Sequence, residues 1–355
     1  MHSSISSSER PVPDRPWPAI FGAVIVACIL LTAGWELYWR RVGFIDHDYV
    51  DTPGRWAMQR RKATGDRTVV IGSSRAYFDI NLRVWAEETD GPAPIQLSLV
   101  GTSPRGILTE LANDSAFSGL VVVGVTPAIF FRTRKGYLAD FPERADQESP
   151  SEWLGQRLFM RIEDLFAFVD WDTRLGTILE RQPLPLRDGM ELDRAVRKVS
   201  VTGADRQTYL EPRILADSAY RQLVRDIWLD GTDGPNRRPS PGADSVTAAI
   251  AEISRDVAAL RARGGDVAFV RFPSSGGVRE LERRDFPRER YWDRLASEVD
   301  AVAIHFEDHL ALRGYETPEW SHLSRSDAER FTRDLVPILM DSVARRRAAR
   351  TGSGP

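Results

Sequence analysis

Two serines stand where a hydroxyl could act as a nucleophile. Ser73 and Ser74 follow the apolar run 68–71, which indicates a buried strand, and Gly72 allows a sharp turn out of that strand. In open α/β sheets, ligands bind outside the carboxyl ends of the strands. The serines are therefore expected beside a binding site, although Gly-Ser-Ser is also an ordinary sequence for a loop that ends a strand.

A serine hydroxyl reacts at neutral pH only when a base, usually a histidine oriented by a carboxylate, takes its proton. His322 lies in a loop between the last predicted strand and the last predicted helix, and Glu319 precedes it by three residues. In a parallel sheet this loop emerges at the same edge as the loop after the first strand. We therefore expect His322 to meet Ser74, and Glu319 to bind the other ring nitrogen and fix its tautomer.

The elements that must position these residues alternate between strands and helices. Short, continuous apolar runs predict buried strands at 68–71, 95–99, 120–125, 266–271 and 301–306. Amphipathic segments predict helices at 82–89, 104–114, 243–263, 288–298 and 324–347. The predicted fold class is therefore α/β, with a three-layer, flavodoxin-like parallel sheet of about five strands.

The alternation is interrupted between residues 132 and 242. Amphipathic segments near 152–169 and 205–229 predict a helical insertion there, and no strand is expected. We expect the aromatic side chains of the insertion to pack against the main sheet, because buried aromatics are more common than binding surfaces. These residues are Phe159, Phe166, Phe168, Trp171, Tyr209, Tyr220 and Trp228.

One segment near the N-terminus is apolar enough to cross a membrane. Residues 17–39 are apolar except for Thr32 and Glu36, and they carry tryptophans near both ends. As a helix this length spans a hydrocarbon core of about 30 Å. No small-residue cleavage site follows, so a retained anchor is expected rather than a signal peptide. Arginines flank the segment on both sides, and the positive-inside rule therefore gives no orientation.

These patterns divide the chain into five parts. They are a disordered leader (1–15), a transmembrane helix (16–41), a connection (42–67) with a short helix at 55–62, an α/β domain (68–347) carrying the insertion 132–242, and a disordered tail (348–355). At 355 residues and 42% hydrophobic, the chain can bury a sizeable core.

Composition and motifs exclude several classes of site. The net charge of −3 argues against a nucleic-acid binder, and the single cysteine, Cys28, excludes intramolecular disulfides and cysteine metal sites. His305 and His309 are four residues apart, but no HExxH or third-ligand pattern accompanies them, so we expect a solvated surface and no metal. Nucleotide-binding glycine motifs are absent, and no cofactor is predicted.

The segment that carries the two serines and the segment that carries Glu319 and His322 together resemble the motifs of a known family. Gly72-Ser73-Ser74-Arg75 and Glu319-Trp320-Ser321-His322 are similar to the G-x-S-x and D-x-x-H motifs of the SGNH/GDSL hydrolase superfamily. The resemblance covers residues 66–131 and 264–340. It is strongest to the membrane-anchored bacterial branch, which includes the D-alanyl transfer protein and exopolysaccharide acyltransferase-like proteins.

The resemblance implies a role for each site residue. It places the nucleophile at Ser74 rather than Ser73, the base at His322 and the carboxylate at Glu319, where the family usually has aspartate. It also implies oxyanion donors at Ser74 and Gly101.

One position departs from the family pattern. The family often has an asparagine after the third strand, whereas this chain has Thr126-Pro127, so Thr126 or backbone amides would have to serve instead. Loss of one oxyanion donor typically costs about 10²- to 10³-fold in turnover.

Two arginines emerge near the same edge of the sheet. Arg75 and Arg271 could neutralise a carboxylate or a sugar acid of a substrate. The alternative is that an arginine pairs with Glu280 or Glu282 as part of an ordinary turn.

The resemblance implies a membrane-anchored serine acyl-ester hydrolase or O-acyltransferase that acts on an envelope or exported polysaccharide. The protein would lie in the bacterial inner (cytoplasmic) membrane as a single-pass protein, with its domain outside the cytoplasm. Its expected partners are the membrane, an acylated glycan and a possible membrane protein, with no nucleic acid. The alternative is a catalytically inactive SGNH-like fold that binds a glycan or scaffolds a membrane assembly.

Overall fold

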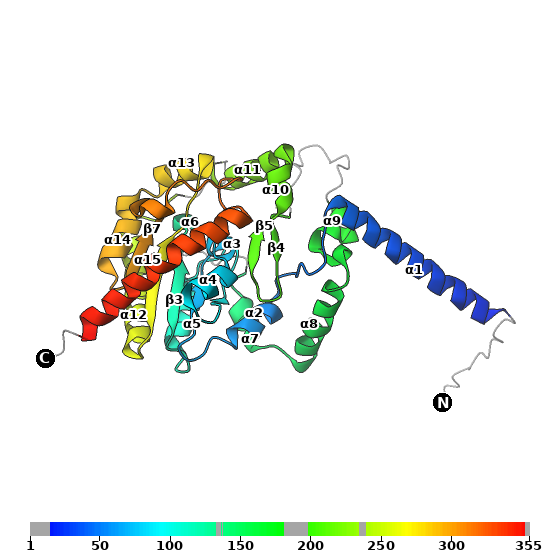
Figure 1. Ribbon diagram of the computed structural model, residues 1–355, viewed down its shortest axis with the longest axis horizontal. Coiled ribbons are helices and arrows are strands. Elements are labelled where there is room, and N and C mark those ends of the chain that lie inside the picture. The colour runs from blue at the N-terminus through cyan, green and yellow to red at the C-terminus, as the bar shows by residue number, and fades with distance from the viewer. Residues whose placement is uncertain (1–14, 133–135, 137, 181–197, 234–238, 352–355) are drawn as a thin grey trace, which may run out of the picture.

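The centre of the molecule is a five-stranded sheet in which all neighbouring strands are parallel. The computed structural model describes residues 15–132, 136, 138–180, 198–233 and 239–351, so the predicted leader lies almost entirely outside the described residues. The strands are β1 (Val69–Ile71), β2 (Ile95–Gln96), β3 (Leu120–Gly124), β6 (Asp266–Arg271) and β7 (Val302–His305). Their spatial order is β2-β1-β3-β6-β7, which confirms the predicted flavodoxin-like α/β fold (Figure 1).

Helices cover both faces of the sheet because its strands are apolar on both sides. Along β1, Val69 and Ile71 belong to one core and Val70 to the other. The first core is closed by α2 (Pro53–Arg60), α5 (Arg105–Asn113), α12 (Ala243–Ala262) and α14 (Trp292–Glu298). The second is closed by α4 (Leu82–Thr89) and α15 (Arg325–Thr351).

The strand order reverses between β1 and β3, and a short helix packs directly on the ends of these two strands. This helix is α3 (Ser74–Phe78). A Cβ atom at Gly72 would lie 2.4 Å from Ala76 Cβ, and one at Gly124 would lie 2.5 Å from the same atom. Gly72 is not among the residues with positive φ. The glycine is therefore needed for close approach of α3 rather than for an unusual backbone angle.

Gly72→Ala is expected to lower the free energy of unfolding by about 1–3 kcal/mol, because the added methyl group forces Ala76 or β3 to move. Gly106→Ala on α5 is the control. Nothing lies within 4 Å of a Cβ at Gly106, so this substitution is expected to leave stability unchanged or raise it slightly. Urea unfolding measures both, and equal effects of the two substitutions would contradict the prediction.

The insertion is not purely helical. It contains α7 (Phe141–Asp146), α8 (Pro150–Glu163), α9 (Leu175–Glu180), α10 (Pro212–Ala216) and α11 (Ser218–Asp233). It also contains an antiparallel pair, β4 (Ser200–Thr202) and β5 (Thr208–Leu210), so the expectation of no strand was wrong. These strands are three residues long, too short to give a clear sequence period.

Arg206, in the turn between β4 and β5, joins the insertion to the sheet. Its buried guanidinium donates to the carbonyl oxygens of Gln96 and Ser98 at 2.8 and 2.9 Å and pairs with Asp51. Gln96 is the last residue of β2 and Ser98 follows it, so Arg206 contacts the sheet at the edge where the site is expected.

The bounds of several other helices and strands differ modestly from those predicted. Residues 97–99 leave the regular strand, although the amides of Leu97 and Leu99 still donate to β1 and to Gly72. A further helix, α13 (Gly276–Asp285), follows β6. The predicted helix 288–298 is a 3₁₀ turn followed by α14. Helix α15 runs on through Thr351, into the segment predicted as a disordered tail.

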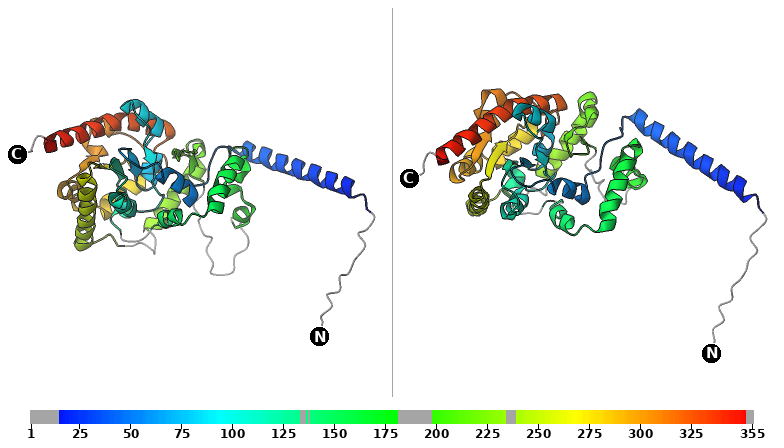
Figure 2. Two further views of the ribbon diagram at one scale, coloured as in Figure 1. Left: turned by 90° about the horizontal axis from the view of Figure 1, so that it is seen from below. Right: turned by 60° about the horizontal axis from the view of Figure 1, so that its bottom comes forward.

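The N-terminal helix α1 (Trp17–Val42) projects away from the α/β domain (Figure 2). It is long and apolar enough to cross a membrane, and none of its residues is buried. Its C-terminal end lies against η1 (Ala167–Val169) of the insertion. There the carboxylate of Glu36 accepts the amides of Ala167 at 3.0 Å and Phe168 at 3.2 Å.

Candidate active site

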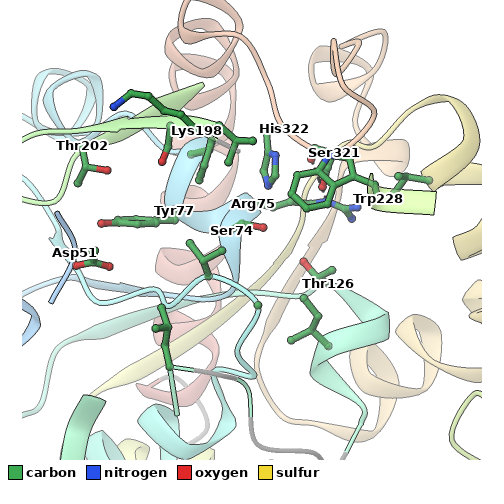
Figure 3. Close-up of a pocket in the computed structure, with 18 of the residues that line it drawn as sticks. Asp51, Ser74, Arg75, Tyr77, Thr126, Lys198, Thr202, Trp228, Ser321 and His322 are labelled. Atoms are coloured by element: carbon green, nitrogen blue, oxygen red, sulfur yellow. Dashed lines mark hydrogen bonds between the residues drawn. The ribbon is translucent and has the colours of Figure 1, made fainter. Parts of the chain in front are cut away.

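A cavity of about 850 Å³ lies beyond the carboxyl ends of β1 and β3, and we call it the central cavity. Its lining includes Ser74, Arg75, Gly101, Thr126 and His322. Figure 3 shows Ser74, Thr126 and His322 facing the same space. The tertiary structure therefore brings together the predicted nucleophile, base and oxyanion positions from four separate segments of the chain.

Glu319 and His322 form a buried pair. The Nδ1 atom of His322 lies 2.9 Å from a carboxylate oxygen of Glu319, and the backbone amide of His322 donates to the same oxygen at 2.6 Å. The other carboxylate oxygen accepts the amide of Ser321 at 3.2 Å and the indole N–H of Trp228 at 2.5 Å. With Nδ1 hydrogen-bonded to the carboxylate, Nε2 is the nitrogen left to accept a proton.

The imidazole ring is enclosed by two aromatic side chains. Phe78 at the end of α3 stacks on His322 with ring centroids 4.3 Å apart. Trp228, which comes from α11 of the insertion, meets the ring edge-on at 6.0 Å. The insertion aromatics were expected to pack against the main sheet rather than to form a binding surface. Trp228 packs against a buried apolar cluster, and its indole also reaches the Glu319 carboxylate and the His322 ring.

The α3 segment also positions the histidine loop. The Asp79 carboxylate accepts the amide of Leu323 at 2.9 Å, and Arg75 Nε donates to the carbonyl of Ser321 at 3.1 Å. Burial raises the pKa of Asp79 well above its usual range, with the negative charge of Glu319 acting in the same direction. The Asp79 carboxyl group that holds the loop is thus one whose charged form is disfavoured by burial and by the nearby Glu319.

The turn that carries Glu319 and His322 is strained. Trp320 has a φ of +76°, a value that an L-residue rarely adopts and that costs about 1–3 kcal/mol. Arg225 of α11 lies over the Trp320 ring at 4.8 Å and donates to the carbonyl of Pro318 at 2.6 Å. The amide of Ser275 donates to the carbonyl of Trp320. These contacts hold the strained turn in place.

The two serines have different surroundings. Ser73 is 1% exposed, and its hydroxyl has no hydrogen-bond partner among the described residues. Ser74 is partly exposed and lines the central cavity. No hydrogen bond joins Ser74 to His322 within the described structure, and His322 Nε2 is buried without a partner there. The nitrogen that would accept the serine proton therefore has no hydrogen-bond partner among the described residues, and both Ser74 and His322 line the central cavity.

The predicted oxyanion positions lie around Ser74. Gly101 follows β2 with a φ of +61°, and Thr126 caps the short helix α6 (Pro127–Phe130) after β3. Both residues line the central cavity. The asparagine of the family pattern has no counterpart at Thr126, so donors here would be backbone amides and the threonine hydroxyl.

Arg75 and Arg271 share one buried partner, Glu282 of α13. Arg75 donates to Glu282 at 2.7 Å, Arg271 donates to the other carboxylate oxygen, and Ser274 donates to that oxygen at 2.7 Å. Burial alone would raise the pKa of Glu282, but the two arginine charges outweigh it and lower that pKa to about 2. The structure therefore shows the ion-pair alternative, in which both guanidiniums are hydrogen-bonded to the single carboxylate of Glu282.

His305 is not on a solvated surface, contrary to expectation. Its ring is buried, stacks on Phe306 at 5.0 Å and meets Trp292 edge-on at 5.2 Å. Burial lowers the pKa of His305 to about 3, so the ring is neutral at physiological pH. Among the described residues, no group of three or more histidine, cysteine, aspartate or glutamate side chains is placed to bind a metal ion.

Comparisons with known proteins assign no family to the chain. No protein-family model matches it, and no curated protein matches it in sequence.

Proposed function

We propose that the protein is an SGNH-like serine acyl-ester hydrolase or O-acyltransferase. The observation that carries this proposal is the buried Glu319–His322 pair, whose free Nε2 lies at the same cavity as Ser74. The order of the parts also agrees with the resemblance: a serine after the first strand and a histidine loop before the last helix.

The chemistry would proceed through an acyl-enzyme. As Ser74 Oγ attacks the ester carbonyl, its proton passes to His322 Nε2, and Glu319 stabilises the imidazolium. Backbone amides at Ser74 and Gly101, with Thr126, would stabilise the oxyanion. Collapse of the tetrahedral intermediate releases the alcohol, which takes the proton from His322. Water or a sugar hydroxyl then attacks the acyl-enzyme carbonyl and gives its proton to His322; the bond between the acyl group and Ser74 Oγ breaks, and Ser74 takes the proton back, which gives hydrolysis or transfer.

The proposed substrate is an acylated polysaccharide of the envelope or one being exported. The apolar helix α1 supports a single-pass anchor in the bacterial inner membrane, and the resemblance places the domain outside the cytoplasm. Arg75 and Arg271 are engaged by Glu282, so recognition of a substrate carboxylate by these residues is not part of the proposal.

Labelling by a fluorophosphonate tests the enzyme proposal directly. The full-length protein in detergent is expected to form a covalent adduct, and mass spectrometry of its peptides should place the adduct on Ser74. No adduct, together with no hydrolysis of p-nitrophenyl esters, would contradict the proposal.

A second function, an inactive SGNH-like fold that binds a glycan or scaffolds a membrane assembly, is favoured by two observations. Ser74 and His322 share no hydrogen bond among the described residues, and Thr126 replaces the asparagine. Binding of acylated glycan without adduct formation would support this alternative.

Trp228→Phe is expected to slow fluorophosphonate labelling about tenfold, because a hydrogen bond to a charged group contributes about 1.5–3 kcal/mol and Glu319 retains three other donors. Trp228→Ala should be slower still, since it also removes the ring that meets His322. The measurement is the second-order rate constant of labelling, with urea unfolding as a check on folding. Equal rates for the wild type and both variants would show that Trp228 does not position the pair.

A further inference from the structure

The insertion carries a large apolar face that the described chain leaves exposed. On α8 and just beyond it, Leu154, Leu158, Ile162 and Leu165 recur at helical spacing, and Leu158 is 58% exposed. The face continues with Trp153, Trp171, Leu175 and Leu179, which are 43–65% exposed. We call these eight residues the α8–α9 face. Such a concentration of exposed large apolar side chains in one segment, 153–179, indicates an interaction site.

The α8–α9 face adjoins the end of the apolar helix α1. Glu36 of α1 accepts two amides of the η1 region, and Arg40 donates to the carbonyl of Leu165 at 3.3 Å. The face is therefore attached to the point where α1 would leave a bilayer. In each view of Figures 1 and 2, α8 runs at a steep angle to α1 rather than alongside it. If α1 spans a membrane, α8 lies along the membrane surface.

Charge and aromatic pattern fit a lipid headgroup region. Arg157 lies over the ring of Trp153 at 3.5 Å, and Arg174 lies over the ring of Trp171 at 4.4 Å. Tryptophan is enriched at membrane interfaces, and arginine places its apolar stem along hydrocarbon while its charge reaches phosphate. Leucine side chains between such pairs would enter the boundary of the acyl chains.

We propose that the α8–α9 face lies in the headgroup region of the same bilayer that α1 spans. This inference rests on the membrane anchor of the proposed function but not on its catalysis. The second contact would fix the tilt of the domain, and it would hold the mouth of the central cavity near the membrane, because Trp171 belongs both to the face and to the cavity lining.

The test uses the full-length protein, alone in vesicles of phosphatidylcholine and phosphatidylglycerol, with one fluorophore on a single cysteine. The native Cys28 is exposed on α1 and reports the anchor. Leu158→Cys, made with Cys28→Ser, reports the α8–α9 face. Leu310→Cys in the same background is the matched control, because Leu310 is an exposed leucine that follows β7, and β7 lies on the opposite side of the molecule from α8 in Figure 1. Lipids with a quencher near the headgroup, and others with a quencher deep in the acyl chain, are added in separate samples.

The label at position 158 is expected to lose at least about half of its emission with the shallow quencher, because interfacial helices sit about 5–10 Å into the headgroup and acyl boundary. The label at position 310 should lose little, and that at Cys28 should respond to the deep quencher. Adding Leu154→Asp and Ile162→Asp should abolish the response at 158.

Quenching at Cys28 without quenching at 158 would overturn the inference and leave the anchor intact, pointing to a protein partner for the face. No quenching at Cys28 would remove the anchor and the inference together. Neither result bears on labelling of Ser74, so failure of the inference and failure of the enzyme proposal are distinguishable.

Discussion

Ser74→Ala is expected to lower esterase activity by at least about 10³-fold and to abolish fluorophosphonate labelling, because it removes the hydroxyl that is proposed to form the acyl-enzyme. Ser74 is partly exposed at the cavity, and its hydroxyl makes no hydrogen bond among the described residues. Its loss is therefore expected to leave the free energy of unfolding within about 0.5 kcal/mol of the wild type. Ester hydrolysis and urea unfolding on the same preparations measure the two effects.

Ser73→Ala is the matched control, since it removes the neighbouring hydroxyl. That hydroxyl is buried and has no partner among the described residues, so its removal should leave stability unchanged or raise it by about 1 kcal/mol. Activity should stay within a few-fold of the wild type. If Ser73→Ala abolished labelling and Ser74→Ala did not, the assignment of the nucleophile would be wrong.

Glu282→Ala is expected to destabilise the protein by about 3–5 kcal/mol, because it leaves two buried guanidiniums without their shared carboxylate. It should also reduce activity, since Arg75 would be freed from the position in which it holds the carbonyl of Ser321. The exposed Glu280 lies two residues away on the same helix, and Glu280→Ala should change stability by less than about 0.5 kcal/mol. Urea unfolding compares the two variants.

The pH dependence of this effect has a definite sign. The pKa of Glu282 falls from 4.5 to about 2 on folding, so its ionised form stabilises the folded state. This contribution, about 3 kcal/mol, is fully present above pH 4.5 and is lost as the pH falls towards 2. The stability difference between the wild type and Glu282→Gln should therefore shrink over that range. A constant difference between pH 6 and pH 3 would contradict the assigned charge of Glu282.

Much of the fold follows from local pattern. The strands are short and apolar on both faces, which is the residue pattern expected for a parallel sheet covered by helices on both sides. Helix α1 was also predictable, because an apolar run of this length favours a helix long enough to cross a membrane. The β4–β5 pair was missed because three-residue strands carry too little pattern to distinguish them from loop.

The candidate site was only partly predictable. Ser74, Glu319 and His322 could be placed together because each lies in a loop that leaves the same edge of the sheet. The roles of Trp228 and Asp79 depend on contacts across 91 and 244 positions of sequence separation, which no local spacing encodes. The sequence likewise did not show that Glu282 pairs with both Arg75 and Arg271, because that pairing depends on the burial of all three side chains.

The sequence by itself determined the parallel α/β sheet, the apolar N-terminal helix and the residues able to act as nucleophile, base and carboxylate, because periodicity and loop position depend on residue order. Only the tertiary structure decided which groups meet. Packing of α11 against the histidine loop supplies the fourth donor to Glu319, and burial turns Arg75 and Arg271 from candidate ligands into partners of Glu282. Such pairings depend on distance and desolvation, which arise only when distant segments are folded together.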